Sequence, residues 1–355
     1  MNRSHSLRRV LAATLGGLAV AAIVPAAWAQ APGGDTVVRT GDQRPIRGTV
    51  TQVARDAVTV RRGTTVEQVP ANQIETIRYD DEPPKFNLAR ASERGGNLEN
   101  AIQLYRETAE AAGTGRPQLL EDLQYYIARS TARLALADPA RLDEAAGLLE
   151  AFVEQHPNSY HYYPLHEWLA RVYMQTGNVA KARLALDTLR SAPWKEYQLR
   201  AIVAEGRLLQ RQQQYEAAIA QFERVLAEQA ATPDEKLQQQ TAELAKAECL
   251  VALERFTDAE ELLRGVIAAA PPERSDVHAA AHTALGDCLR AAGKAKEALL
   301  AYLYVDLLCA DQKQEHAKAL YYLAELWNEI GQPARAEDAL ARLQSDYPNS
   351  PWAKR

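Results

Sequence analysis

The sequence predicts a mainly α protein, in which a solenoid of repeated helix pairs follows a small all-β module. Three observations support this fold class: one phrase recurs along most of the chain, its apolar residues have helical spacing, and a β-rich composition is confined to residues 35–80. An alanine marks each copy, and successive alanines are 36 to 44 residues apart. The alanines are Ala101, Ala145, Ala182, Ala218, Ala259, Ala298 and Ala336. A period of this size indicates one structural unit copied many times.

Each copy is expected to form a helix, a short turn and a second helix. In the sixth copy, Leu285, Gly286 and Leu289 lie on one stripe at helical spacing. Gly293 then interrupts the helix, and Ala298 begins a second stripe. Gly286 and Ala298 have little or no side chain, so two helix backbones can approach closely where they cross. Gly293 suits a helix end because a left-handed backbone costs glycine nothing.

These phrases resemble the tetratricopeptide repeat family, whose signature includes Leu-Gly, an aromatic residue, a later alanine and a proline. The resemblance covers residues 86–355 as about seven helix pairs, and it implies a right-handed superhelix. The longer period here predicts longer helices or turns than the family's usual ones. Two copies depart from the pattern: one has a lengthened turn at 137–139, and another has Lys246 where leucine is expected. The phrases that begin at His156 and Tyr347 are also similar to those of bacterial envelope repeat proteins of the outer-membrane-assembly and Tol-associated kind.

The first 29 residues have the layout of a cleaved secretory signal peptide. Arg3, Arg8 and Arg9 precede an alanine- and leucine-rich apolar run, and residues 27–29 form a small-x-small cleavage site. The apolar run of about 15 residues is shorter than the roughly 20 that span a bilayer. We therefore expect export across the inner membrane and a periplasmic mature chain, by either the general secretory or the twin-arginine route. The alternative is an uncleaved N-terminal membrane anchor.

Residues 35–80 alternate apolar and polar residues and are rich in Val, Thr and Ile. Four short runs separated by tight turns read as strands, and together they predict a small SH3-like or Sm-like barrel. The runs are Ile46 to Val53, Ala57 to Val60, Thr65 to Val69 and Ile74 to Tyr79. The module is either a cap that covers the first helix pair or a second binding module. Residues 81–85 follow as a short acidic linker.

Charge and motifs favour binding over catalysis. The formal net charge is −5, and −8 without the three arginines of the signal segment. This balance argues against nonspecific binding to nucleic acid or to anionic lipid, although it leaves room for a local basic patch. No phosphate-binding glycine loop, GxSxG elbow or HExxH motif is present. We therefore expect no enzymatic activity and no cofactor.

Histidine and cysteine spacing gives little support to a metal site or a disulfide. His278 and His282 are four residues apart, as two zinc ligands on one helix can be, but no third ligand follows at a clear spacing. We therefore expect both histidines to pack against other side chains rather than to bind a metal. Cys249, Cys288 and Cys309 are an odd set, so we expect buried free thiols rather than a disulfide framework.

In the family that the repeats resemble, the first helix of each pair lines a concave groove. The resemblance therefore implies lining residues at fixed positions before each repeat's alanine, with a basic middle and a mixed far end. The candidates for partner binding are Arg171, Arg200, Arg207, Arg211, Arg290, Lys318 and Tyr321. Because arginine binds carboxylates through a bidentate fork, an acidic peptide segment or a chain's C-terminus is the expected guest. The alternative is that these arginines pair with acids on neighbouring helices.

The expected function is a non-enzymatic scaffold of the bacterial cell envelope that binds partner proteins or peptides in the concave groove. The alternative is a self-associating structural envelope protein, a homo-oligomer joined through the aromatic cluster at residues 160–168 or through the terminal repeat. That cluster is equally a candidate for packing of the third repeat on the second. Neither function requires nucleic acid or stable membrane insertion after signal cleavage.

Overall fold

The computed structural model describes residues 34–41, 44–113 and 115–355. The predicted signal segment at residues 1–29 lies outside the described residues. The strands are β1 (Asp35–Arg39), β2 (Ile46–Val53), β3 (Ala57–Arg62), β4 (Thr65–Pro70) and β5 (Ile74–Arg78). The helices are α1 (Pro84–Arg94), α2 (Leu98–Ala112), α3 (Pro117–Ala137), α4 (Leu142–Gln155), α5 (Tyr162–Thr176), α6 (Val179–Arg190), α7 (Lys195–Arg211), α8 (Tyr215–Leu226), α9 (Pro233–Ala252), α10 (Phe256–Ala269), α11 (Ser275–Ala291), α12 (Ala295–Leu308), α13 (Lys313–Glu329) and α14 (Pro333–Asp346).

The five strands form one antiparallel sheet in the order β4-β3-β2-β1-β5. Alternate residues of the strands are apolar and buried, as the alternation in the sequence predicts. They pair across strands: Val37 lies opposite Ile46 on one side and Ile77 on the other. The register shifts next to Arg39 and after Val50, so the sheet curls at two points.

The prediction of a barrel is wrong, because β4 and β5 lie at opposite edges of an open sheet and do not pair with each other. The helices cover the β5 edge instead. Arg90 of α1 donates a hydrogen bond to the carbonyl of Ile77 at 2.8 Å, and the hydroxyls of Thr76 and Tyr126 lie 2.9 Å apart. One continuous hydrophobic core joins the buried face of the sheet to α1 and α3. A sheet whose apolar face and one edge are covered by helices has no need to close on itself.

The sheet also contacts helices beyond the first pair. The guanidinium of Arg116, at the start of α3, makes an ion pair with buried Asp35 at 2.6 Å. The guanidinium of Arg55 lies 3.9 Å from the ring centre of Tyr162 in α5. Asn72 donates a hydrogen bond to Glu196 in α7 at 2.5 Å. The sheet therefore runs along the first helix pairs rather than only covering the end of the solenoid.

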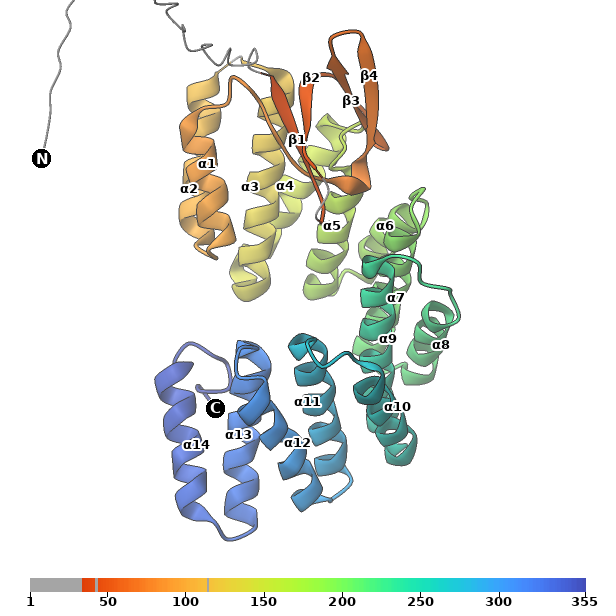
Figure 1. Cartoon of the computed structure of the whole chain (residues 1–355), viewed down its shortest axis with the longest axis vertical. Coiled ribbons are helices and arrows are strands. Elements are labelled where there is room, and N and C mark those ends of the chain that lie inside the picture. Colours follow the sequence, from red (N-terminus) through yellow and green to blue (C-terminus); the bar gives the residue numbers. More distant parts are fainter. Residues whose placement is uncertain (1–33, 42–43, 114) are drawn as a thin grey trace, which may run out of the picture.

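In the described part of the chain the helices form seven consecutive pairs. The pairs are arranged along an arc (Figure 1), from α1 and α2 beside the sheet to α13 and α14 at the C-terminus. The seven marker alanines are each at most 1% exposed, and each lies in the second helix of its pair. Close approach at the crossing explains two glycines. A Cβ atom on Gly206 would lie 2.5 Å from the Phe222 ring, and one on Gly286 would lie 2.6 Å from the Tyr302 ring. The repeat register predicted from the sequence is therefore confirmed.

The longer period arises mainly in α3 and α9, which have 21 and 20 residues. A 3₁₀ turn at Pro139–Arg141 fills the lengthened connection of the second repeat. Lys246 does not disturb the fifth repeat, because its ammonium lies near the surface and donates to Glu223 at 2.8 Å. No helix in the described part of the chain has both the length and the apolar character needed to cross a membrane.

The predicted cysteines and histidines have packing roles. Cys249, Cys288 and Cys309 are buried free thiols. The ring of His282 stacks on Tyr304 with 3.7 Å between ring centres, and His278 lies 6.0 Å from the same tyrosine ring. Among residues 34–41, 44–113 and 115–355, no three His, Cys, Asp or Glu side chains are placed to hold a metal ion.

Candidate peptide-binding groove

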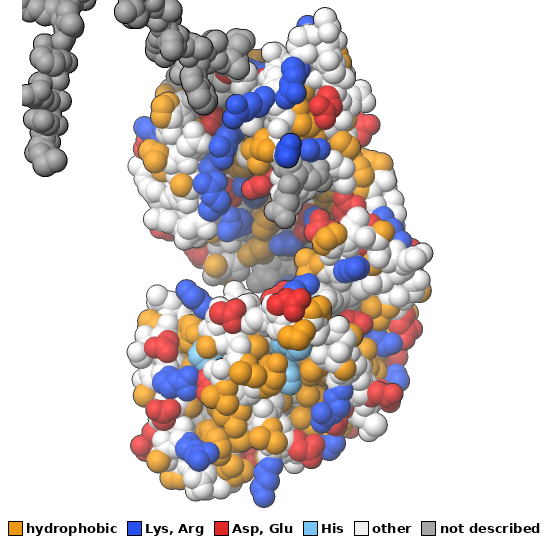
Figure 2. Space-filling model, viewed as in Figure 1, with side chains coloured by type: hydrophobic (Ala, Val, Ile, Leu, Met, Phe, Trp, Pro, Cys, Tyr) orange, Lys and Arg blue, Asp and Glu red, His pale blue; other side chains and the backbone are white. Residues whose placement is uncertain are grey.

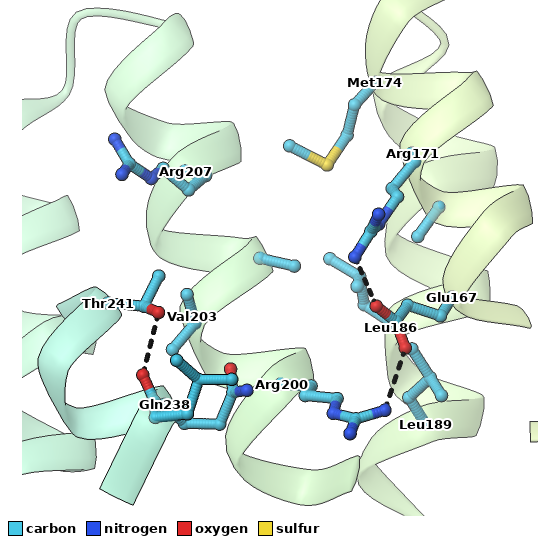
Figure 3. A pocket seen from close by; sticks show the side chains of 13 residues that line it. Glu167, Arg171, Met174, Leu186, Leu189, Arg200, Val203, Arg207, Gln238 and Thr241 are labelled. Carbon is cyan, nitrogen blue, oxygen red and sulfur yellow. Dashed lines mark hydrogen bonds and ion pairs between the residues drawn. The ribbon is translucent and has the colours of Figure 1, made fainter. Parts of the chain in front are cut away.

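A groove of about 550 Å³ opens between α5, α6, α7 and α9 (Figure 3). It forms because α5, α7 and α9, the first helices of their pairs, each turn one face toward the interior of the groove. On α5 the lining residues are spaced three and four apart, and α7 repeats the spacing. The lining residues are Glu167, Ala170, Arg171 and Met174 of α5, Leu186 and Leu189 of α6, Arg200, Val203, Ala204 and Arg207 of α7, and Leu237, Gln238 and Thr241 of α9.

Three of the predicted partner-binding residues, Arg171, Arg200 and Arg207, come together around this groove. Arg211 lines an adjoining hollow, which it shares with Arg207 and Met174. The resemblance to the repeat family therefore placed the arginines of the third and fourth repeats on one continuous surface.

The other three predicted residues lie further along the solenoid and do not line this groove. Arg290 of α11 has its guanidinium 4.4 Å from the ring centre of Tyr322. Lys318 of α13 makes an ion pair with Asp287 at 2.5 Å. Tyr321, next along α13, packs against Trp352 with 5.5 Å between ring centres.

Glu167 stands between two arginines of the groove. It accepts a hydrogen bond from Arg171 on its own helix and another from Arg200 on α7, the latter at 3.2 Å. Burial lowers the pKa of Arg200, but the charges of Glu167 and Tyr197 outweigh it and raise that pKa above its ordinary value. Arg200 therefore keeps its charge, and its main partner is an acid that a second arginine also uses.

The remaining groove arginines also have partners within the protein. Arg207 makes an ion pair with Glu248 of α9 and donates to Gln210 at 3.0 Å. Arg211 donates to the backbone carbonyl of Met174 at 3.0 Å, at the end of α5. The structure thus shows the pairing with neighbouring helices that the sequence left as an alternative, and the middle of the groove is charge-compensated rather than strongly basic.

Between these ion pairs the floor of the groove is apolar. Met174 and Val203 reach into it from two sides in Figure 3. Leu237 of α9 is 47% exposed, which is unusual for a leucine beside a groove. The groove therefore combines an apolar floor with a rim of paired charges, and this combination suits a peptide side chain flanked by polar backbone.

The contribution of α9 to the groove was not predicted from the sequence. Counting back from Ala259 by the spacing that separates Ala218 from Arg200 and Arg207 selects Thr241 and Glu248. Both bear on the groove, Thr241 as a lining residue and Glu248 as the partner of Arg207. Leu237 lies on an earlier turn of the longer α9, which this counting does not reach.

The aromatic cluster of the third repeat belongs mostly to the core. Tyr160 is buried, and its hydroxyl donates to the carboxylate of Asp122 at 3.0 Å. His161 stacks on Tyr125 with 3.6 Å between ring centres. These contacts join the third repeat to the second, as the packing interpretation predicted.

Three family models, each described as a tetratricopeptide repeat, match the chain at residues 136–201, at residues 203–274 and 244–308, and at residues 318–350. Together the matches cover more than half of the chain. No curated protein sequence matches it.

Among solved structures, a tetratricopeptide repeat protein from Parabacteroides merdae is 16% identical with a TM-score of 0.52, over 76% of this chain and 94% of that one. The apo form of RapI is 13% identical with a TM-score of 0.51, over 75% of this chain and 76% of that one. PilW, described as a type IV pilus biogenesis factor, is 19% identical with a TM-score of 0.46, over 64% of this chain and 97% of that one.

These similarities agree with the geometry of the solenoid. The first two structural matches share its fold, and the family models match segments that run from α4, the second helix of the second pair, to α14. With the marker alanines buried in one register and the glycines at the helix crossings, the chain belongs to the tetratricopeptide repeat family.

Proposed function

We propose that this protein is a scaffold of the bacterial cell envelope that binds a partner protein or peptide in the groove between α5, α7 and α9. Tetratricopeptide repeats are generally non-enzymatic interaction modules, and stacked repeats present extended surfaces for binding. The observation that carries the proposal is the apolar floor at Met174, Val203 and Leu237. Arginines border this floor, and a carboxylate of the guest can replace their present ion-pair partners. The signal-like residues 1–29 support an envelope location.

The chemistry of the groove favours a guest with one apolar side chain next to a carboxylate. An apolar side chain placed over Leu237 and Val203 would leave water, which contributes about 1.5–3 kcal/mol for a residue the size of leucine. A guest carboxylate can take Arg200 from Glu167, because Glu167 keeps Arg171 as its partner. The exchange therefore leaves no buried charge without a counter-ion. An acidic segment or a free C-terminus meets these requirements.

The groove also needs little rearrangement to bind. Its lining residues project from packed helices, and Leu186 and Leu189 of the floor are almost completely buried. A guest peptide would then be the main element that loses conformational freedom, and this lowers the entropic cost of binding.

Site-specific photocrosslinking in cells tests the proposal. A photoreactive amino acid at position 237 lies in the groove, and one at position 184, where leucine is 68% exposed on α6, is the matched control outside it. We expect position 237 to give a discrete adduct with a second protein, recovered in the periplasmic fraction, and position 184 to give none of it. Identical adducts from the two positions, or recovery only in the cytoplasm, would contradict the proposal.

Charge reversal identifies the contribution of the arginines. Arg200→Glu combined with Arg207→Glu should abolish the adduct from position 237, because a guest carboxylate would meet repulsion. Arg224→Glu is the control, since Arg224 is exposed on α8 and bonds only Gln221 among the described residues. An adduct that survives the double change, in protein with an unchanged circular dichroism spectrum, would show that the groove arginines do not hold the partner.

A further inference from the structure

The outward face of α12 is unusually apolar. Leu300 is 66% exposed and Leu307 is 73% exposed, and Leu303 and Tyr304 between them are half-buried. Figure 2 shows hydrophobic side chains gathered over α11, α12 and α13 in the lower half of the molecule, with histidines beside them. Exposed apolar patches of this kind mark interaction surfaces.

Equivalent positions of neighbouring repeats are charged or small. When the marker alanines are aligned, the position of Leu300 is taken by Glu261 in α10 and Asp338 in α14. The position of Leu307 is taken by Ala268 and Ser345 in the same two helices. In α6 the position of Leu300 is taken by Leu184, which is also exposed, but the position of Leu307 is taken by Ser191. Leucine at both positions therefore distinguishes α12 from the other second helices, and the packing of the solenoid does not account for the pair.

The spacing of these residues is that of a helix-pairing seam. Leu300, Leu303 and Leu307 follow one another at intervals of three and four residues, which is the spacing of the contact positions in a coiled coil. The seam has a charge of opposite sign at each end. Lys296 precedes Leu300 by one turn, and Asp311 lies in the turn that follows the helix. Neither makes an ion pair within the described part of the chain.

This arrangement is complementary to itself in one orientation only. About a two-fold axis midway between Leu300 and Leu307, an antiparallel copy places Leu300 of one protomer on Leu307 of its partner. The same operation brings Lys296 of each protomer to Asp311 of the other, so the ion pair forms twice. A parallel pairing would instead bring like charges together at both ends.

A histidine supports the seam from within the protein. His282 stacks on Tyr304 and has no hydrogen-bond partner for either ring nitrogen among the described residues. Burial, with the nearby charges of His278 and Arg264, lowers the pKa of His282 to about 4, so its ring is neutral at pH 7. Both ring nitrogens are buried within the protein, so a neutral ring avoids the cost of burying a charge beside Tyr304.

We propose that the outward face of α12 is a self-association surface, on which a second copy of the chain packs antiparallel about a two-fold axis. The helix is about 21 Å long, so the contact is small and the dimer is weak and dependent on concentration. α12 is the second helix of its pair, whereas first helices α5, α7 and α9 line the groove. Dimerisation therefore leaves both grooves open and makes the scaffold divalent, which strengthens binding to a partner with two docking segments.

Sedimentation velocity of the purified full chain over a wide concentration range is the first test. We expect a monomer–dimer equilibrium that Leu307→Glu shifts to monomer at every concentration. Leu184→Glu, at an equally exposed leucine on α6, should leave the equilibrium unchanged. Both substituted residues are exposed, so thermal melting should match the unsubstituted chain. A chain that is monomeric throughout, or a dimer that Leu307→Glu leaves intact, overturns the proposal.

A charge exchange tests the orientation. Lys296→Asp or Asp311→Lys alone should weaken the dimer by about tenfold, since two ion pairs become two repulsions. The double variant should restore the dissociation constant to within about threefold of the original. A double variant no tighter than either single one overturns the antiparallel geometry.

Disulfide trapping tests the register. A mixture of chains carrying Leu300→Cys and Leu307→Cys should crosslink on oxidation, because these positions face each other across the axis. Either variant alone should crosslink much less, since two copies of position 300 would lie roughly 10 Å apart. Equal crosslinking in all three samples would exclude a second copy as the occupant of this face. Crosslinking to a different protein, or insertion into lipid vesicles without dimerisation, would exclude it as well.

Discussion

Gly286→Ala should destabilise the protein, although alanine favours helices more than glycine does. An added Cβ would lie 2.6, 2.7 and 2.8 Å from three atoms of the Tyr302 ring, well inside the 3.5–4.0 Å of a normal carbon contact. The ring cannot easily move, because Tyr302 is fully buried, stacks on Tyr322 and donates its hydroxyl to Asp287 at 2.7 Å.

The magnitude follows from two opposing effects. Overpacking of a filled core costs about 1–3 kcal/mol, and the gain in helix propensity offsets about 1 kcal/mol. We therefore expect a net loss of up to about 2 kcal/mol in the free energy of unfolding for Gly286→Ala. Gly265 in α10 is the matched control, because a Cβ there would meet nothing within 4 Å. Gly265→Ala should stabilise the protein by about 0.5–1 kcal/mol.

Urea unfolding followed by circular dichroism measures both variants. The two midpoints should move in opposite directions for the same chemical change. If Gly286→Ala raises the midpoint as Gly265→Ala does, the helix crossing is looser than the structure shows and the explanation of this glycine is wrong.

Two further predictions concern the backbone and pH. Gln213 and Glu254 occupy the left-handed region with φ of 60°, at turns where other repeats have glycine, so Gln213→Gly and Glu254→Gly should each raise stability by about 0.5–1 kcal/mol in thermal melts. Burial raises the pKa of Glu121 to about 7, with a hydrogen bond from Ser159 opposing the shift and Asp122 adding to it. Because the folded-state pKa is above the unfolded one, this group makes the protein lose stability as pH rises from about 4.5 to 7. Glu121→Gln should therefore stabilise at pH 8 by about 1–3 kcal/mol and have little effect at pH 4.5, and a gain independent of pH would show that ionisation is not the cause.

The repeat architecture could be predicted because its signals are local. The marker alanines, the glycines before them and the apolar stripes all lie within one helix pair, and the close contact of Gly286 with Tyr302 involves residues only 16 positions apart. Four of the five described strands, β2 to β5, were predicted for the same reason, whereas β1 was not. The predicted closure into a barrel was wrong, because whether the sheet closes depends on Arg90 and α1, which cover the β5 edge.

The groove was predicted in part. The resemblance to the repeat family placed Arg171, Arg200 and Arg207 on one face, but the charge of that face depends on Glu167 and on Glu248 of a neighbouring helix. The apolar seam on α12 could not be recognised from the sequence. Its leucines are visible in the sequence, yet in a buried helix they would be core residues, and only their exposure distinguishes them.

By itself the sequence determined the helix pairs, their number and their common register, because periodicity and turn chemistry act over a few residues. The sequence also predicts a signal segment before the β module. The tertiary structure decided which charges neutralise one another, whether the sheet closes, and which leucines remain exposed. These depend on contacts between segments far apart along the chain, such as Arg207 with Glu248 and Asn72 with Glu196, which the packing of the helices and the sheet brings together.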